Sequence, residues 1–583
     1  MAQKRSFNEG KRHFKKNKKQ KKSTTASDGS NEDILLADVR RLLANTRLGT
    51  IKNEEEEEKK LPDQFSEVDL EISELSSTGD GLAQKDGQVY VVPFAAPGDT
   101  IRAKIYRHVE EESYFLADFV EVLSPSEHRT ETPKCPYFTQ CSGCQFQHLP
   151  YAFQLAHKRR VVEQAYQNFS NLSPKAVPEV GDTIGSPLQY GYRTKLTPHF
   201  DGPPGGRRDK RQGKQVTWPE VPPIGYMKKG TKKTMDIEDC PIGTEAVRGG
   251  MKRERKRVSD EIDKYQRGAT LLLRESTERI KKSDNGQQLN GDGEKPEHDA
   301  VLEDRGDYIH RKTCITDSKA ISTEYVDSFR FDNPAGAFFQ NNNSILPLIT
   351  QYIRDNILGT SPPTNSTPSR PTKPRIKNLV DAYSGSGFFT ITLSSLFQKS
   401  IGIDISPQSI ASASMNAKLN NLPEGATRFI AADAAKLFES LDVETYKPEE
   451  TVVVLDPPRK GCDEGFIRQL LGFAPERICY VSCNVHTQAR DVGWLVGGIA
   501  GEGKEEGEGK GVDGLYEIES LRGFDFFPQT GHVEGVAILR KKKNGVEDQR
   551  ADEPAVKVES ETAAKTPDPK VEEDVKQQPD AER

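Results

Sequence analysis

The sequence predicts an α/β protein whose largest part is a doubly wound, Rossmann-like domain near the carboxyl end. Apolar runs typical of buried strands alternate with helix-like segments from residue 376 to residue 540. A glycine-rich turn, Tyr383 to Gly387, follows the first run, and the second run ends in the carboxylate Asp404. Ahead of this domain, short alternating segments separated by Gly and Pro turns predict a small β-barrel.

Both ends of the chain are expected to be disordered. The chain has 583 residues and a net charge of −6, and only 34% of its residues are hydrophobic while 30% are charged, so parts of it will not join a core. Residues 1–60 form a charged N-terminal segment with ten Lys or Arg among the first 22, and residues 545–583 carry few apolar side chains. The basic run at 15–22 fits a nuclear-localisation or nucleic-acid-binding patch, or merely a solvated arm.

The sequence also bears on location. Neither a secretory signal nor a transmembrane helix is expected, because the basic head lacks an apolar region and no run of about 18 apolar residues occurs. We therefore expect an intracellular protein, located in the nucleus, the cytoplasm or both. We also expect it to be a monomer. A mitochondrial location stays open, although the Lys-rich head is not typical of a transit peptide.

Residues 61–125 are expected to form an OB-like β-barrel. The strand-like segments at 68–72, 88–92 and 101–105 are separated by turns at 79–81 and 97–99. A barrel of this kind presents one strand face to RNA or DNA. A barrel that only packs on its neighbour is the alternative.

Residues 126–335 are expected to form a central α+β region with a cysteine cluster. Cys135, Cys141 and Cys144 lie within ten residues, and Cys240 follows 96 positions later. Four thiolates from two loops fit a tetrahedral metal or an iron–sulfur cluster, and the uneven spacing favours iron–sulfur over a zinc ribbon. Unligated loop cysteines are the alternative. Polar or Pro-rich insertions are expected at 205–211, 281–297, 361–375 and 501–511.

Residues 336–544 form the predicted doubly wound domain. We expect strands at 376–381, 400–404, 428–433, 451–455, 477–482, 515–521 and 533–539. Ser406 and Pro407 predict the start of a helix after the second strand. Ligands of such sheets bind at the carboxyl ends of the strands. We therefore expect five residues to lie at one edge: Tyr383, Asp404, Asp433, Asp456 and Cys483.

The glycine turn favours S-adenosylmethionine as the cofactor. An acid about 20 residues after such a turn suits a ribose diol. Phe388 and Phe389 directly follow Gly387, so the dinucleotide fingerprint is incomplete and a nicotinamide cofactor is disfavoured.

Five motifs together resemble the RNA 5-methyluridine methyltransferases, the class that includes the enzyme making ribothymidine in the T-loop of transfer RNA. They are Phe338-Phe-Gln340-Asn341, Asp381-Ala-Tyr-Ser-Gly-Ser-Gly387, Asp456-Pro-Pro-Arg459-Lys-Gly461, Val481-Ser-Cys483-Asn484 and Gly531-His-Val-Glu534. The resemblance covers residues 61–540. It implies that the barrel is the RNA-binding TRAM module, and that the four clustered cysteines hold the [4Fe–4S] cluster found in some members.

The resemblance also implies roles for individual residues. Uracil C5 is a poor nucleophile, so the Cys483 thiolate would first add to C6 and create an enolate. Glu534 would then remove the C5 proton before elimination of the thiolate. Asp456, Gln340, Tyr383 and Asp404 would contact the cofactor. Phe338 would stack on the extruded base.

Two departures from the family pattern affect the cofactor loop. Many members have Cys-Gly-x-Gly-Asn where this chain has Ser384-Gly-Ser-Gly-Phe388, and the acid after the second strand is Asp404 instead of Glu. Cofactor affinity is expected to be lower for this reason.

Methylation of uridine 54 in transfer RNA is the predicted reaction. Three alternatives are the same reaction on ribosomal RNA, cytosine-5 methylation, and a non-catalytic RNA-binding protein. The joint presence of Cys483 and Glu534 argues against the last.

Overall fold

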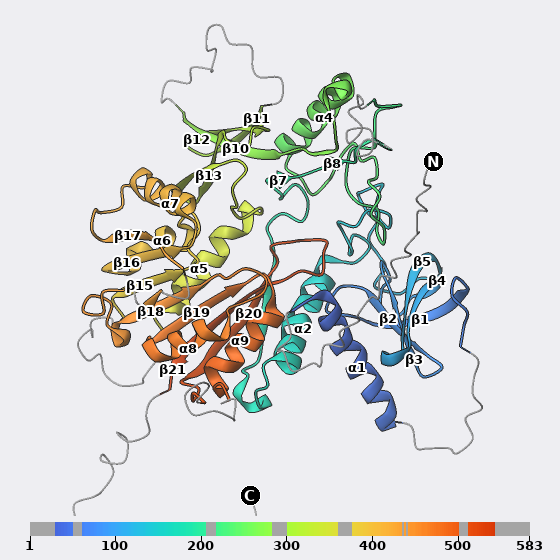
Figure 1. Ribbon diagram of the computed structural model, residues 1–583, viewed down its shortest axis with the longest axis horizontal. Coiled ribbons are helices and arrows are strands. Elements are labelled where there is room, and N and C mark those ends of the chain that lie inside the picture. The colour runs from blue at the N-terminus through green and yellow to red at the C-terminus, as the bar shows by residue number, and fades with distance from the viewer. Residues whose placement is uncertain are drawn as a thin grey trace, which may run out of the picture. The chain divides into compact units, whose positions relative to one another are not determined.

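The fold is described from a computed structural model, drawn in Figure 1. The structure describes residues 29–49, 61–203, 205, 217–282, 300–359, 376–433, 437–438, 441–500 and 511–542. The basic run at 15–22 and the predicted disordered tail at 545–583 lie outside the described residues. Nearly all of the four predicted insertions do so as well.

An eight-stranded sheet forms the centre of the predicted doubly wound domain (Figure 1). The strand order is β17-β16-β15-β18-β19-β21-β20-β6, and β21 runs antiparallel to β19 and β20. The bounds are β6 (Gly181–Ile184), β15 (Asn378–Ala382), β16 (Lys399–Asp404), β17 (Thr427–Ala431), β18 (Thr451–Leu455), β19 (Arg477–Ser482), β20 (Tyr516–Phe524) and β21 (Glu534–Lys541). The seven predicted strands are confirmed, because apolar runs of this length are typical of strands, and the central strands β15, β18 and β19 are buried on both faces.

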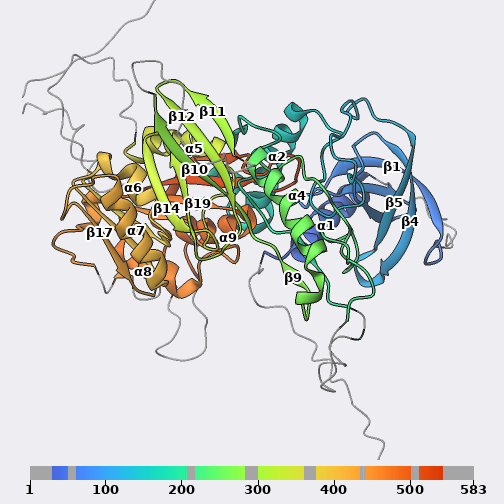
Figure 2. The same cartoon turned by 90° about the horizontal axis from the view of Figure 1, so that it is seen from above.

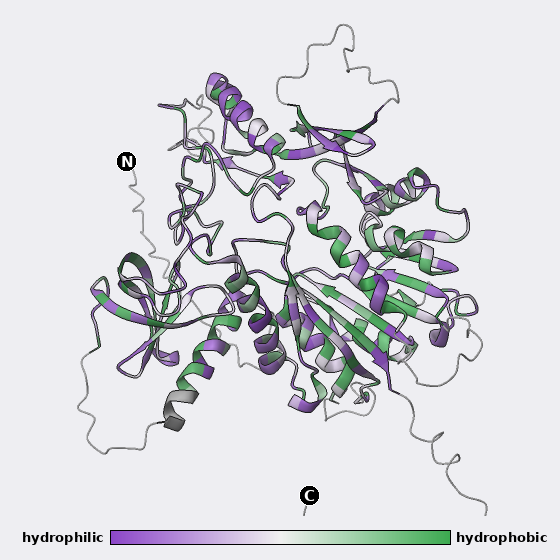
Figure 3. Ribbon diagram, turned by 180° about the vertical axis from the view of Figure 1, so that it is seen from behind, coloured by the Kyte–Doolittle hydropathy of each residue, from purple (hydrophilic) through white to green (hydrophobic). Residues whose placement is uncertain are grey.

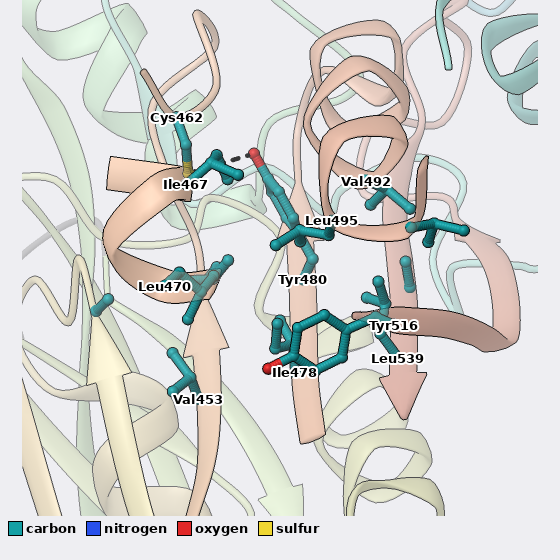
Figure 4. Packing of buried hydrophobic residues seen from close by; sticks show 14 of the residues in the cluster. Val453, Cys462, Ile467, Leu470, Ile478, Tyr480, Val492, Leu495, Tyr516 and Leu539 are labelled. Atoms are coloured by element: carbon teal, nitrogen blue, oxygen red, sulfur yellow. Dashed lines mark hydrogen bonds between the residues drawn. The ribbon is translucent and has the colours of Figure 1, made fainter. Parts of the chain in front are cut away.

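Alternate residues of the central strands enter two separate cores, one on each face of the sheet. In β18, Val453 and Leu455 join one core, whereas Val452 and Val454 join the other. Figure 3 shows the strands of this sheet coloured mainly as hydrophobic. Figure 4 shows the first core, where Tyr480 of β19 directs its hydroxyl to the Cys462 sulfur at 3.6 Å. The period of two along each strand therefore builds both layers at once.

Helices cover both faces of this sheet. The first core contains side chains of α2 (Tyr151–Phe169), α8 (Glu464–Phe473) and α9 (Val485–Gly497), and the second contains those of α5 (Leu346–Ile357) and α6 (Phe388–Leu393). As predicted, α7 (Pro407–Leu419) begins after Ser406, whose side chain accepts a hydrogen bond from the Ser409 backbone at 3.2 Å. Helices on both faces make this a doubly wound arrangement.

Five strands form the predicted barrel, which is closed in the order β1-β2-β3-β5-β4. The strands are β1 (Glu67–Leu75), β2 (Gly81–Lys85), β3 (Gln88–Val92), β4 (Thr100–Val109) and β5 (Tyr114–Ser124). The sequence pattern predicted β1, β3 and β4 but not β2 or β5. In the second half of β5 most residues are exposed and several are polar, so the alternation of apolar and polar residues that predicts a strand is weak there.

Helix α1 (Asn31–Gly49) corrects the prediction that residues 1–60 are disordered. It lies against the barrel, as Figures 1 and 2 show. Val39 and Leu42 pack on Leu82, Val91 and Tyr114 of the barrel. The segment carries apolar residues at helical spacing, Ile34, Leu35, Val39, Leu42 and Leu43, but it lies between two strongly charged stretches. The barrel surface stabilises this helix.

The central region also differs from the prediction of a separate domain at 126–335. Helix α2 packs on α9 and β20, and β6 is the edge strand of the large sheet, so both belong to the doubly wound domain. The rest is α+β as expected: α4 (Glu245–Asp260) packs on β10 and β12 (Figure 2). The remaining strands are β7 (Lys195–Leu196), β8 (His199–Phe200), β9 (Ala269–Thr270), β10 (Leu273–Lys281), β11 (Val301–Arg305), β12 (Tyr308–Ile315), β13 (Ile321–Val326) and β14 (Phe329–Pro334).

Candidate active site

Cys483 occupies the turn between β19 and α9, at the carboxyl end of the sheet. The next residue, Asn484, caps α9 by accepting a hydrogen bond from the His486 backbone at 3.2 Å. The Ser482 hydroxyl accepts a hydrogen bond from the Asn484 backbone at 3.1 Å and tightens the same turn. The local sequence therefore fixes the thiol between a buried strand and a capped helix.

Glu534 reaches Cys483 through the pairing of β19 with β21. Ser482 lies opposite Gly535 in this antiparallel pair, so one further step along the register places Cys483 opposite Glu534. Side chains directly opposite each other share one face of the sheet. Gln488 of α9 holds the two strands by donating to the carbonyls of Tyr480 (2.8 Å) and Gly535 (3.0 Å). The sheet thus joins two residues that are far apart in the sequence.

Burial and charge control the protonation of this pair. Burial raises the pKa of the Cys483 thiol to about 12, and the carboxylates of Glu534 and Asp456 add to the rise. Burial likewise raises the pKa of Glu534 well above its usual value, with Asp456 adding to it. The Arg459 guanidinium lowers both pKa values and also hydrogen bonds to the thiol. Arg459 belongs to one of the five motifs, but the sequence predicted no role for it.

Asp456 follows β18 and belongs to a second acidic pair. Burial raises its pKa to about 7, and the neighbouring Asp381 carboxylate adds to the rise. Asp381 lies within β15 and accepts hydrogen bonds from the Thr390 backbone (2.9 Å) and hydroxyl (2.6 Å). Its other carboxylate oxygen, Oδ1, has no hydrogen-bond partner among the described residues. The sequence predicted no role for Asp381 either, because its position within a strand pattern gave no separate signal.

The glycine turn and Asp404 form a cradle at the ends of β15 and β16. Asp404 accepts hydrogen bonds from the backbones of Gly385 (3.0 Å) and Ser406 (2.8 Å). Gly385 has a φ of +53° and open space where a side chain would project. The buried Ser384 hydroxyl lacks a partner among the described residues. An open backbone, a free hydroxyl and a fixed carboxylate suit a ligand with hydroxyl and amine groups.

The other predicted site residues lie in different surroundings. The Tyr383 ring packs on Phe466 and its hydroxyl faces the Cys462 sulfur at 3.9 Å. Phe338 is 74% exposed on the loop after β14, where the next residue, Phe339, is buried against Phe331 and Phe388. Gln340 on the same loop is half-buried.

A cavity of about 650 Å³ opens beside Cys483. Cys483, His532, Arg459 and Lys460 contribute to its wall from the catalytic domain. The barrel contributes Thr78, Asp80, Arg107 and Tyr114, the cysteine loop contributes Gln145, and the following region Lys229. Phe338 and Gln340 are not among the lining residues. The cavity therefore joins the Cys483 thiol to the barrel, with several cations on its wall.

Cys135, Cys141, Cys144 and Cys240 are all free thiols. Burial raises the pKa of Cys144 and of Cys240 to about 12, and in both the neighbouring cysteines add to the rise. Within the described ranges, no group of three or more His, Cys, Asp or Glu side chains is arranged to hold a single metal ion. The donor set is four sulfurs, which is the set that an iron–sulfur cluster takes.

Comparisons with known proteins decide the family. The tRNA (uracil-5-)-methyltransferase family model matches residues 369–498. A tRNA (uracil(54)-C(5))-methyltransferase of Schizosaccharomyces pombe is 41% identical over 527 residues, which cover 90% of this chain and 86% of that protein. This chain belongs to the tRNA (uracil-5-)-methyltransferase family. The Saccharomyces cerevisiae tRNA (uracil(54)-C(5))-methyltransferase is 39% identical, over 81% of this chain and 73% of that protein.

A solved member shares the fold. The Pyrococcus abyssi tRNA (uracil-54, C5)-methyltransferase, crystallised with S-adenosyl-L-homocysteine, aligns with a TM-score of 0.52 and 22% identity over 81% of this chain and all of that structure. The methyltransferase fold is therefore confirmed.

Among the described helices of the present chain, none has the length and apolar character that a membrane crossing requires.

Proposed function

We propose that this protein transfers a methyl group from S-adenosylmethionine to C5 of uridine 54 in transfer RNA. The observation that carries the proposal is that Cys483 and Glu534 lie next to the last residue pair of β19 and β21 and interact electrostatically, beside a cavity that reaches the barrel. The names of the two yeast relatives support transfer RNA and position 54.

Cys483 and Glu534 would act in successive steps of the reaction, Cys483 in the addition to the base and Glu534 in the later removal of a proton. The Cys483 sulfur bonds to C6, and the resulting enolate carbon C5 takes the methyl group from the sulfonium of the cosubstrate. Glu534 then removes the C5 proton, the C6–S bond breaks, and one proton is released for each methyl group transferred. A carboxylate with a raised pKa is a stronger base, which suits this step. Arg459 would stabilise the thiolate before addition.

The cradle at Asp404 would hold the cosubstrate. The Asp404 carboxylate suits the ribose diol, while Ser384 and Asp381 offer unpaired oxygens nearby. The remaining predicted contacts, from Asp456, Tyr383 and Gln340, belong to the same proposal. Since the Tyr383 hydroxyl faces Cys462, its contact would come from the backbone or the ring.

The barrel would act as a TRAM-type RNA-binding module. Arg107 of β4, Lys229 and Lys460 line the cavity that holds Cys483, and such cations attract phosphates. An exposed aromatic such as Phe338 offers a stacking surface for an extruded base once the RNA is bound.

Mechanism-based trapping tests the two catalytic roles. Transfer RNA with 5-fluorouridine at the target position has no removable C5 proton, so we expect a denaturant-stable adduct with the wild-type enzyme and none with Cys483→Ala. Glu534→Gln should accumulate a similar adduct, with its C5 proton retained, on unmodified RNA, because only proton removal is blocked. Gel shift under denaturing conditions and mass spectrometry measure both.

A matched control separates chemistry from loss of a charge. Glu517→Gln changes an exposed carboxylate on β20 that pairs with Arg540, so it should form no adduct with unmodified RNA and keep full activity. Absence of adducts in every protein, with methyl transfer intact, would disprove the covalent route.

We also propose that Cys135, Cys141, Cys144 and Cys240 hold a [4Fe–4S] cluster with a structural or RNA-positioning role. After anaerobic purification we expect iron and acid-labile sulfide in equal amounts, and we expect Cys144→Ser to lose both. Cys314→Ser, which changes a partly buried thiol on β12 outside the four, should retain them. A colourless protein containing zinc, or no metal, would contradict this proposal.

A further inference from the structure

Helix α1 ties the barrel to the residues around the nucleophile. Its apolar face packs on the barrel through Val39 and Leu42. Just before the helix, the Gly29 carbonyl accepts a hydrogen bond from the Asn484 side chain at 3.0 Å. The same amide group of Asn484 donates to the Arg459 carbonyl at 3.1 Å. Asn484 therefore connects the start of α1 with both Cys483, its neighbour in the chain, and Arg459.

Polar contacts fix the helix in this position. The buried Asp38 carboxylate accepts hydrogen bonds from the Ser77 backbone (2.6 Å) and hydroxyl (3.3 Å) at the turn between β1 and β2. Arg41 of α1 and Arg160 of α2 both form ion pairs with Glu74 of β1. A buried carboxylate is costly without such partners, so α1 has one favoured placement on the barrel.

The first turn of α1 forms a wall of the catalytic cavity. Ser30, Asn31, Glu32, Ile34 and Leu35 line it together with Cys483. The Ser30 hydroxyl is used by the helix itself, since it accepts a hydrogen bond from the Asp33 backbone at 3.2 Å. Asn31 and Glu32 have exposed side chains.

A buried histidine marks an unused hydrogen-bonding position in the same cavity. His486 lines it and is only 6% exposed, and its Nδ1 atom has no hydrogen-bond partner among the described residues. Buried polar atoms are nearly always paired, so an unpaired one on a cavity wall indicates a place for a ligand group.

Charge divides the cavity wall into two parts. Arg107, Lys229 and Lys460 favour phosphates, and Lys229 also pairs with Asp80 of the same wall at 3.3 Å. The Glu32 carboxylate, at the start of α1, disfavours phosphates. A carboxylate and an amide accept and donate hydrogen bonds at the edges of splayed bases, which is how single-stranded RNA loops are read.

We propose that α1 is a selectivity element, in which Asn31 and Glu32 contact the base edges of the loop nucleotides that flank the target uridine. The inference rests on the proposed function and adds a structural reason for choosing one loop over another. Asn31 and Glu32 are positioned to discriminate among substrates and take no part in the chemistry.

The test compares methyl transfer to a transfer RNA transcript with transfer to transcripts carrying base changes on either side of the target uridine. The double variant Asn31→Ala/Glu32→Ala should reduce the kcat/KM ratio between the parent and changed transcripts by about tenfold, as expected when one base-edge interaction is removed. Its affinity for S-adenosylmethionine and its melting temperature should equal those of the wild type.

Arg40→Ala is the matched control, because Arg40 lies on the same helix, pairs with Glu112 and does not line the cavity. It should keep wild-type discrimination. Unchanged discrimination in the double variant, or an equal loss of rate on every transcript, would overturn the inference. A wild-type enzyme that methylates no transcript would instead count against the proposed function, and the inference would fall with it.

Discussion

The environment of Cys483 combines features that oppose and favour its thiolate. Burial and the carboxylates of Glu534 and Asp456 stabilise the thiol, whereas Arg459 stabilises the thiolate. His532 does not supply a charge, because burial lowers its pKa to about 4 and the nearby cations Arg459, Lys158 and Arg193 add to the decrease. In the free enzyme at neutral pH, Cys483 is therefore held as the unreactive protonated thiol. Arg459 is the cation that lowers the pKa of this thiol.

Alkylation of Cys483 should report this balance. With a thiol pKa of about 12, the thiolate fraction increases about tenfold for each pH unit across the neutral range, and the rate of iodoacetamide modification should follow it. Arg459→Met should raise the pKa further and slow the modification at every pH below it. Peptide mass spectrometry would distinguish Cys483 from the other cysteines of the chain.

The fully buried Cys479, which lies on β19 just before Cys483, is the internal control. It should stay unmodified in the folded enzyme. A rate at Cys483 that does not change with pH would show that the thiol is already ionised and that the assigned surroundings are wrong.

At the scale of elements, α2 positions the loop that leads to Glu534. Lys158 of α2 pairs with Asp525 at 2.5 Å, and both side chains are fully buried. Asp525 also accepts hydrogen bonds from the Tyr151 hydroxyl (2.9 Å) and the Phe527 backbone (3.1 Å). This cluster anchors the segment between β20 and β21 on a helix from the central part of the sequence.

Lys158→Met should destabilise the protein by about 3–5 kcal/mol, because it leaves a buried carboxylate without its cation. Urea unfolding followed by tryptophan fluorescence measures the change. Arg159→Met is the neighbouring control, and since its ion pairs are on the surface its effect should be small. Equal stabilities for Lys158→Met and the wild type would show that the pair is not formed.

At the scale of the whole molecule, the barrel, α1, the cysteine loop and the catalytic domain meet around one cavity. Its cations come from separate segments, since Arg107 lies in β4 and Lys229 follows much later in the chain. Binding of RNA there should depend strongly on salt, because cations that neutralise phosphates release counterions.

The quantity to measure is the slope of a plot of log RNA affinity against log salt concentration. In the variant Arg107→Ala/Lys229→Ala this slope should be shallower by about 1.4–1.8, because each phosphate left without its cation reduces it by roughly 0.7–0.9. Filter binding over a series of salt concentrations gives this slope. Lys256→Ala/Lys264→Ala removes two exposed cations outside the cavity lining and should leave the slope close to that of the wild type. Equal slopes in all three proteins would contradict RNA binding at the cavity.

The cellular compartment and the monomeric state of the protein stay predictions.

Much of the catalytic domain and the candidate site was predictable because the signals are local. The runs at 451–455 and 477–482 match β18 and β19, and their continuous apolar character identifies buried strands in any context. Cys483 and Asp456 follow those strands directly, so topology alone places both at one edge. The opposition of Cys483 and Glu534 was not readable, because register depends on pairing between strands that are distant in sequence.

By itself, the sequence determined the order of strands and helices in the catalytic domain and the residue types available at the strand ends. These follow from the period of apolar residues and from residue types at fixed offsets. Only the tertiary structure decided that α1 is ordered, that α2 and β6 join the catalytic sheet, and that Arg459, Glu534 and Asp456 surround Cys483. Those features depend on packing between segments far apart in the chain, which no local pattern encodes.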